Sequence, residues 1–142
     1  MNKVFTGRTA VSGDVIEGEA IVSTMPFGFF GGCNPREGII IDQWHDLHGQ
    51  SIKDKVFIYP EGRGSTVGAA VMLELVRTGS APLAILNNQC ELISQCGCIL
   101  AKKLYDVSLP MIDQFQTDIT RAIKTGDRVR IDPVAGTVEV LE

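Results

Sequence analysis

The stretch of sequence that decides the fold is residues 56–79, VFIYPEGRGSTVGAAVMLELVRTG. The apolar run Val56–Ile58 predicts a buried strand, and the apolar periodicity of Thr66–Arg77 predicts a helix that ends at Gly79. A glycine-rich turn joins the two elements. Glycines let backbone N–H groups approach a ligand closely, and the positive end of a helix dipole favours an anion. The stretch therefore predicts an anion-binding site.

Three side chains of this turn add chemistry to the predicted site. Arg63 is a fixed cation that can hold a carboxylate or a phosphate through two hydrogen bonds, and Ser65 and Thr66 add hydroxyl groups. Ser65 is the best catalytic candidate, because a helix N-terminus and a nearby cation both stabilise an alkoxide and so favour general acid–base catalysis. The alternative is structural: Ser65 or Thr66 caps the helix, and Gly62 and Gly64 only make the turn tight.

Several common enzyme classes are excluded by what the sequence lacks. No Gly-Lys-Ser/Thr follows the glycines, which excludes a P-loop nucleotide site, and no G-x-S-x-G elbow occurs. The two histidines, His45 and His48, are expected at the surface or as anchors of a loop, since metal binding would need further ligands. Asp42 and Asp113 each follow an apolar run and could either bind a substrate amine or cap a loop.

Composition indicates an ordinary globular protein. The chain has 142 residues, with 44% apolar and 21% charged residues and a formal net charge of −4. Because the basic residues are scattered, nucleic-acid binding is not expected. No apolar run approaches the roughly 20 residues that span a bilayer, and residues 1–8 lack the apolar core of a signal peptide. We therefore expect a cytoplasmic protein without a membrane partner.

The four cysteines show no metal-binding spacing. They are Cys33, Cys90, Cys96 and Cys98, and no C-x-x-C pair occurs among them. In a cytoplasmic protein they should be reduced, and we expect all four to be buried structural thiols. No metal site is predicted on this chain.

The remaining elements predict a mixed α/β fold. The expected strands are Thr9–Val11, Glu19–Val22, Gly38–Asp42, Leu83–Leu86, Leu109–Ile112, Asp127–Asp132 and Thr137–Leu141, with a second long helix near Glu91–Leu104. Alternating strands and helices favour a parallel βαβ centre, and the antiparallel strands near both ends should form an additional β layer. We expect one domain over residues 1–142.

An aromatic, glycine-rich segment precedes this centre, at residues 25–35. It contains Phe27, Phe29 and Phe30 between glycines and prolines, a composition that does not suit regular structure. An apolar loop of this kind often covers a site or a partner. Alternatively, the three rings fill the end of the core. The sequence leaves both interpretations open.

Four motifs, taken in order, resemble the small subunit of the aconitase X family, also described as its swivel-domain protein. They are Phe29-Phe30-Gly31-Gly32-x-Asn34-Pro35, Gly38-x-Ile40-x-Asp42, His45-x-Leu47-x-Gly49-x-Ser51 and Gly62-Arg63-Gly64-Ser65. The resemblance runs over nearly the whole chain and ends in Lys124–Val129. It implies a swivelling β/β/α domain. The usual family loop has lysine where this chain has Arg63.

The resemblance also implies a function. Family members are hydro-lyases in which a large subunit binds an iron–sulfur cluster and most of the substrate, and the small subunit closes over it. The chain should therefore be inactive alone, with Ser65 transferring a proton and with Gly62, Arg63, Gly64 and Thr66 binding an anionic substrate. The segment Phe29–Gly32, which comprises Phe29, Phe30, Gly31 and Gly32, should contact the partner or close the active site. The cluster should belong to the large subunit.

Two substrates are compatible with this resemblance. Some family members dehydrate cis-3-hydroxy-L-proline, which is the first expectation, and others dehydrate mevalonate 5-phosphate in isoprenoid synthesis, which is the alternative. Two other functional classes are alternatives to a dehydratase subunit. A phosphohistidine swivel domain would need a histidine beside Ser65-Thr66, where Val67 and Gly68 stand. A non-catalytic ligand-binding or regulatory module remains open.

Overall fold

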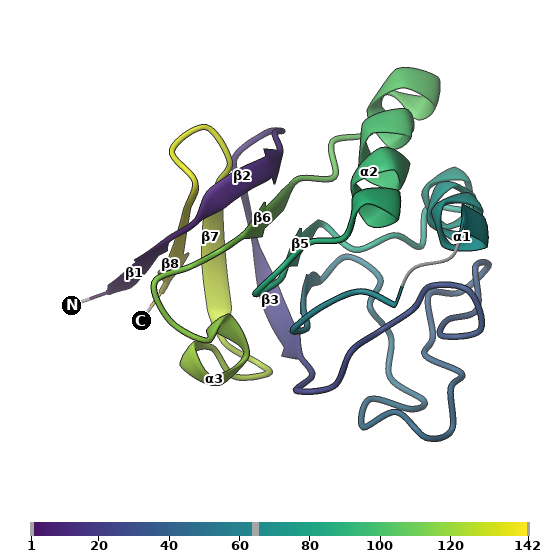
Figure 1. The fold of residues 1–142 in the computed structure, drawn as a ribbon, viewed down its shortest axis with the longest axis horizontal. Coiled ribbons are helices and arrows are strands. Elements are labelled where there is room, and N and C mark those ends of the chain that lie inside the picture. Colours follow the sequence, from purple (N-terminus) through teal and green to yellow (C-terminus); the bar gives the residue numbers. More distant parts are fainter. Residues whose placement is uncertain (1, 64–65, 142) are drawn as a thin grey trace.

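The computed structural model describes residues 2–63 and 66–141. Figure 1 shows how the elements are arranged along the chain. No helix in these two ranges is both long and apolar enough to cross a bilayer. The elements are β1 Lys3–Thr6, β2 Arg8–Val11, β3 Ile16–Val22, β4 Val56–Ile58, α1 Thr66–Arg77, β5 Ala84–Leu86, α2 Leu92–Tyr105, β6 Met111–Asp113, α3 Ile119–Ala122, β7 Arg128–Asp132 and β8 Thr137–Val140.

The strands form one mixed sheet in the order β1-β8-β7-β3-β4-β5-β6-β2. Strands β3, β4, β5 and β6 are parallel to one another, and the remaining pairs are antiparallel. In Figure 1 the antiparallel strands β1, β8 and β7 lie on one side, the parallel strands in the middle, and helices α1 and α2 on the other side. This arrangement confirms the mixed α/β class and the β/β/α order of layers.

The two end strands of the sheet are consecutive in the chain. Only Gly7 separates β1, which pairs with β8, from β2, which pairs with β6. Residues 3–11 therefore border both ends of the sheet, which curls into a nearly closed barrel. Gly7 is required by space: a Cβ there would lie 2.5 Å from the carbonyl oxygen of Asp113. The predicted second layer is thus a continuation of the same sheet.

Alternating side chains of the parallel strands supply two cores. In β4, Val56 and Ile58 point into the barrel, whereas Phe57 points to the helix side, followed there by Tyr59. All four are fully buried. The barrel core also receives Ile119 and Ile123 from α3 and the residue that follows it. Because both faces are covered, the parallel strands are continuous apolar runs.

Three features differ from the sequence-based expectations. Residues 38–42 do not form a strand; Ile39 and Ile40 make only isolated bridges, to Ser51 and Cys33. The N-terminal strands were expected in the additional β layer, but β2 pairs with β6, and β3 pairs with both β4 and β7. Strand β1 and the single-turn helix α3 were not predicted. Each is too short, or too exposed, to produce a clear apolar period.

Candidate functional site

The predicted anion-binding loop lies at the edge of the sheet where the parallel strands end. Strand β4 ends at Ile58 and α1 begins at Thr66, so residues 59–65, here called the glycine loop, connect them. The carboxyl ends of β5 and β6 meet at the same edge. Open α/β sheets bind their ligands outside the carboxyl ends of their strands. The fold therefore places the glycine loop where a ligand of such a sheet would bind.

Backbone hydrogen bonds hold the first half of the glycine loop from both sides. On one side, Phe27 donates its N–H to the carbonyl of Glu61 at 3.1 Å and accepts from the N–H of Arg63 at 2.9 Å. On the other side, the N–H groups of residues 88 and 89 donate to the carbonyl of Pro60 at 2.9 and 3.2 Å. A parallel bridge forms on each side. These hydrogen bonds therefore fix the backbone of residues 60–63 on both sides.

The predicted substrate-binding residues can be placed in part. Gly64 and Ser65 lie outside the described residues, so their roles stay predictions. Arg63 is exposed, and within the described ranges its guanidinium forms no ion pair. Thr66, the first residue of α1, is also exposed. An unpaired cation beside the start of a 12-residue helix is an arrangement that attracts anions.

The aromatic segment beside the glycine loop divides between core and surface. Phe27 and Phe29 are buried, and their rings meet edge to face with centroids 5.0 Å apart. These two rings therefore fill the core, and the Phe29 side chain is not available to a partner. Phe30 is 64% exposed. A contact between Phe30 and a partner stays a prediction.

The aromatic segment and the glycine loop touch. A Cβ on Gly28 would lie 3.1 Å from the carbonyl oxygen of Arg63. Gly31 adopts a positive φ of 78°, and a Cβ on Gly32 would collide with the carbonyl oxygen of Gly28 and the ring of Phe27. The glycines of this motif thus allow a tight loop to pack against the glycine loop. The structure brings together two motifs that the sequence separates by about thirty residues.

A serine, a histidine and an aspartate cluster near the end of β3, but the serine and the histidine are buried. His45 Nδ1 lies 3.2 Å from the backbone nitrogen of Leu47 and 3.2 Å from Asp46 Oδ1, and Nε2 lies 3.3 Å from Ser23 Oγ. Ser23 Oγ in turn donates to Asp46 Oδ1 at 2.6 Å. Because Ser23 and His45 are only 0% and 5% exposed, a substrate cannot reach them. His45, which is buried, anchors the loop.

The two aspartates that the sequence left ambiguous have structural partners. Asp42 Oδ1 accepts the N–H of Trp44 at 3.0 Å and so caps its own loop. Asp113 is fully buried, and its carboxylate accepts hydrogen bonds from Arg8 and from the N–H of Cys90. Burial leaves Asp113 inaccessible to a substrate.

The cysteines do not assemble into a metal site. Cys33, Cys90 and Cys98 are buried, and burial raises the pKa of Cys33 to about 12 and also raises the pKa of Cys90 and of Cys98. Cys96 is exposed, which corrects the expectation that all four are buried; it lies on the face of α2 turned away from Cys98. In the described part of the chain, no three histidine, cysteine or acidic side chains are grouped as a metal ion requires.

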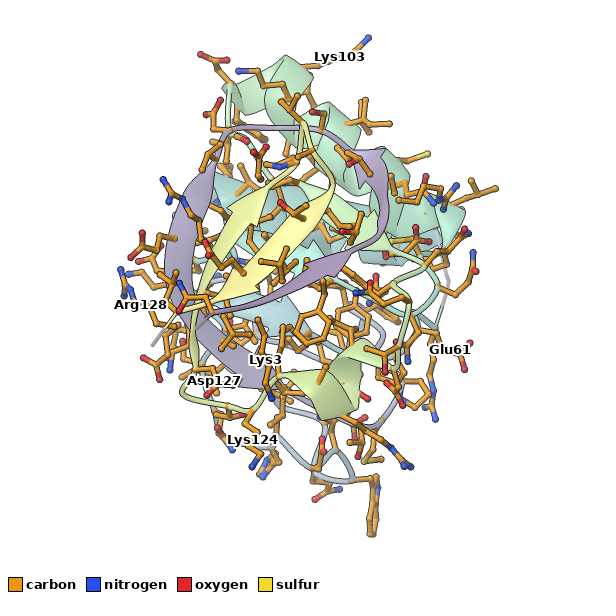
Figure 2. The ribbon with its side chains drawn as sticks, turned by 90° about the vertical axis from the view of Figure 1, so that its left-hand side faces the viewer. Lys3, Glu61, Lys103, Lys124, Asp127 and Arg128 are labelled. Carbon is orange, nitrogen blue, oxygen red and sulfur yellow. The ribbon has the colours of Figure 1, made fainter. Side chains whose placement is uncertain are left out.

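A surface hollow of about 280 Å³ lies away from the glycine loop. It is lined by Lys3, Ala122, Lys124, Asp127 and Val140. Figure 2 shows Lys3, Lys124 and Asp127 near one another, with Glu61 of the glycine loop at another margin of the molecule. The Asp127 carboxylate accepts the backbone N–H of Lys124 at 2.9 Å. None of the residues that line this hollow belongs to the start of α1 or α2, in contrast to the glycine loop.

One carboxylate that was not predicted from the sequence lies against the glycine loop. Glu91 caps the N-terminus of α2, and its side chain lies next to Gly62. The only sequence signal was a glutamate placed just before the apolar period of the second helix. The hydroxyl of Tyr59 was also missed: it is fully buried and has no hydrogen-bond partner among the described residues.

Comparison with known protein families agrees with this geometry. A family model described as the aconitase X swivel domain matches residues 4–140. The chain belongs to the aconitase X swivel domain family. The match spans the barrel, the glycine loop and both long helices, so the swivel domain includes every element described above.

Individual relatives extend the similarity over nearly the whole swivel domain. The chain is 38% identical to the phosphomevalonate dehydratase small subunit of Methanosarcina mazei over 97% of this chain and 91% of that one. It is 44% identical to the protein of the same name from Methanocaldococcus jannaschii, over 95% of both chains. The crystal structure of Thermococcus kodakaraensis aconitase X in its holo-form matches with a TM-score of 0.88, 40% identity and 99% coverage of each chain.

Proposed function

We propose that this chain is the small subunit of a two-subunit dehydratase that acts on mevalonate 5-phosphate. The observation that supports this most strongly is the name shared by relatives that cover nearly all of the chain, phosphomevalonate dehydratase small subunit. From the sequence, cis-3-hydroxy-L-proline is the first expectation and mevalonate 5-phosphate the alternative. The names of the relatives favour the alternative.

The glycine loop suits a phosphorylated substrate. Arg63 is exposed and unpaired within the described ranges, and a guanidinium binds a phosphate through two parallel hydrogen bonds. The N-terminus of α1 adds a positive dipole end beside it. We assign the binding of the anionic group to Arg63 and Thr66, with the backbone of Gly62 and Gly64 allowing close approach.

Ser65 is the residue we assign to proton transfer. Dehydration removes a proton from one carbon and a hydroxyl group from its neighbour, so that a double bond forms and water leaves. Ser65 Oγ, as an alkoxide stabilised by the helix N-terminus and Arg63, would accept the carbon-bound proton. Phosphomevalonate dehydration therefore needs Ser65 near the reacting carbon and Arg63 near a charged end of the substrate.

The iron–sulfur cluster expected for this family does not fit the described residues of this chain. Three of the cysteines are buried and Cys96 is exposed, and no group of three possible metal ligands occurs among the described residues. We therefore place the cluster on the large subunit and derive no step of the reaction from it. On this assignment the isolated small subunit is inactive, because it holds only part of the active site.

Two exposed apolar side chains border the glycine loop on opposite sides and support a protein partner there. Phe30 belongs to the segment that pairs with the loop through Phe27, and Leu92 follows Glu91, which packs against Gly62. Their side chains are 64% and 75% exposed. Burying such residues against a second subunit is favourable and would enclose the site. We propose that the large subunit docks here.

The remaining assignments follow from the same proposal. Residues 1–142 act as one swivel domain in a cytoplasmic complex, without a nucleic-acid or membrane partner. The net charge of −4 and the separation of Lys103 from Lys124 in Figure 2 support the absence of a nucleic-acid surface.

Co-expression with the large subunit tests the proposal. The purified complex should dehydrate mevalonate 5-phosphate and leave cis-3-hydroxy-L-proline unchanged, as measured by mass spectrometry of the products. If the complex dehydrates only cis-3-hydroxy-L-proline, that compound is the substrate and the proposal is wrong. A chain that binds no large subunit and still binds small anions would instead be a non-catalytic ligand-binding module.

A further inference from the structure

Gly62 and Glu91 approach so closely that no larger residue fits at position 62. A Cβ built on Gly62 would lie 2.5 Å from Glu91 Cγ, 3.3 Å from Cδ and 3.2 Å from Oε1. Gly62 has no positive φ, so its backbone is open to any residue. Glycine is therefore needed here for space. The glycine loop rests directly on the Glu91 side chain.

Glu91 cannot move aside easily, because hydrogen bonds at the start of α2 hold both carboxylate oxygens. Oε2 accepts the N–H of Ile93 at 2.9 Å, and Oε1 accepts the N–H of Ser94 at 2.8 Å as well as the Ser94 hydroxyl. Glu91 itself has extended backbone angles, φ −101° and ψ 153°, as an N-cap residue does. The side chain on which Gly62 rests is thus fixed to α2.

Glutamate is an unusual choice for this cap. Serine, aspartate and asparagine are the preferred N-cap residues, because their shorter side chains reach the same amides. A serine at position 91 would cap α2 but would have no Cγ to support Gly62. The glutamate therefore does something beyond capping, and the only described glycine of the loop is what its Cγ contacts.

The charge of Glu91 is compensated within α2. Its carboxylate lies at the positive end of the helix dipole and accepts two amide hydrogen bonds there. The N-terminus of α2 is thus already occupied by an anion from its own chain. The start of α1 and Arg63 remain for an anion from outside, which agrees with the proposed substrate site.

We propose that Glu91 is a positioning residue: by packing its Cγ against Gly62, it sets the position of Gly62 and Arg63 relative to the start of α1. The expected changes in KM rest on the proposed function, whereas the expected position of the loop does not. Backbone hydrogen bonds hold the loop at Pro60, Glu61 and Arg63. The Glu91 side chain packs against the loop at Gly62, so the residue that caps α2 also affects substrate binding.

A double-mutant cycle tests the proposal in the complete complex with the large subunit. Gly62→Ala should raise KM for mevalonate 5-phosphate at least tenfold, because the new methyl group displaces the loop from Glu91. Glu91→Ser should raise KM by a few-fold while α2 stays capped. The double variant Gly62→Ala/Glu91→Ser should bind substrate better than Gly62→Ala alone, since the alanine methyl occupies the space that Cγ vacates.

Two further variants separate positioning from stability and charge. Glu91→Gln keeps Cγ and the shape of the side chain but removes the charge and one of the two acceptors of a backbone N–H. Because Cγ is retained, its KM should lie closer to that of the parent complex than the KM of Glu91→Ser does. Gly68→Ala, in the first turns of α1, is the matched control: a Cβ there meets no atom within 4 Å, and KM should not change. The two Glu91 variants should unfold at temperatures close to that of the parent chain, since serine and glutamine can also cap the helix, and so should Gly68→Ala.

NMR spectroscopy of the isolated chain tests the positioning role of Glu91 even if the complex does not dehydrate mevalonate 5-phosphate. In ¹H–¹⁵N spectra of the isolated chain, Gly62→Ala should shift the amide signals of Glu61 and Arg63, and the second substitution should reverse these shifts. If the effects on KM and on these signals are simply additive, Glu91 does not position the loop. A reversed shift without turnover would uphold the positioning role and reject the proposed substrate.

Discussion

Arg8 meets the buried carboxylate of Asp113 side-on, with Nε 2.9 Å from Oδ1 and Nη2 2.8 Å from Oδ2. Arg8 begins β2 and Asp113 ends β6, so this pair lies where the two strands close the sheet. Oδ2 also accepts the N–H of Cys90 at 2.9 Å. The hydrogen bond and charge of Asp113 raise the pKa of Arg8 above its usual value. The pair joins the first residues of the chain to the carboxyl edge of the parallel strands.

Removing either partner of this pair should destabilise the fold to a different extent. Arg8→Ala leaves the carboxylate of Asp113 buried and uncompensated, whereas Asp113→Asn keeps most of the shape and leaves a half-exposed guanidinium that water can reach. Arg8→Ala should therefore lower the midpoint of urea unfolding more than Asp113→Asn does. The opposite order would mean that the pair contributes mainly through its hydrogen-bond geometry.

Ser65→Ala should lower kcat of the reconstituted complex by roughly 10²-fold or more, the usual scale for a general acid–base group. KM should change little, because the hydroxyl acts mainly in the transition state. Steady-state kinetics with mevalonate 5-phosphate give both constants. If kcat stays near that of the parent complex, Ser65 is only a helix cap and the base belongs to the large subunit.

Arg63→Ala should raise KM strongly and change kcat less, because it removes a charged hydrogen bond to the substrate. Arg63→Lys keeps the charge but cannot form two parallel hydrogen bonds to a phosphate. Its KM should therefore lie between that of the parent complex and that of Arg63→Ala. Arg36→Ala is a control, since Arg36 lies in another loop. Equal effects of the Arg63 and Arg36 substitutions would point to a general loss of positive charge.

Phe30→Asp should weaken binding of the large subunit while the isolated chain stays folded, because this side chain is 64% exposed. Phe29→Asp is the matched comparison: Phe29 is 3% exposed and packs among aromatic rings, so its replacement should unfold the chain. Size-exclusion chromatography of the mixed subunits and circular dichroism of each variant measure the two effects. Normal assembly of the Phe30→Asp complex would remove this segment from the interface.

One thiol of the four should react readily in the folded chain. Cys96 is exposed, whereas burial raises the pKa of Cys33 to about 12 and raises that of Cys90 and Cys98 as well, so their reactive thiolates are scarce in the folded state. Ellman's reagent at pH 8 should titrate a single fast thiol, and all four after denaturation. Cys96→Ser should abolish the fast phase. Rapid labelling of that variant would indicate opening of the core.

The centre of the fold was predictable from local patterns. The bounds expected for α1, Thr66–Arg77, are confirmed, and the strand Val56–Ile58 is confirmed as β4. A fully buried parallel strand is a plain apolar run, and a helix packed on one face has a clear period, so both are visible without tertiary information. The expected strands Asp127–Asp132 and Thr137–Leu141 are confirmed as the antiparallel pair β7 and β8, because a strand with one exposed face alternates between buried and exposed residues.

Long-range features were not predictable in this way. The pairing of Lys3 with Val140 and of Arg8 with Asp113 joins residues that no local pattern relates. The expected strand at residues 38–42 failed because its backbone groups bond to separate segments, at Gly32 and Gln50, instead of to one continuous neighbour. In the candidate site, the turn could be located from its glycines, but the support from Glu91 depends on how the start of α2 meets the glycine loop.

The closure of the sheet by residues 3–11 has a consequence for how the protein is made. Residues 3–6 are synthesised long before β8, with which they pair, because β8 is the last of the described strands along the chain. Until β8 is present, the edge of β1 is unpaired and can associate with other chains. The sheet can therefore close only after β8 has left the ribosome, and chaperone protection matters most during the interval before that.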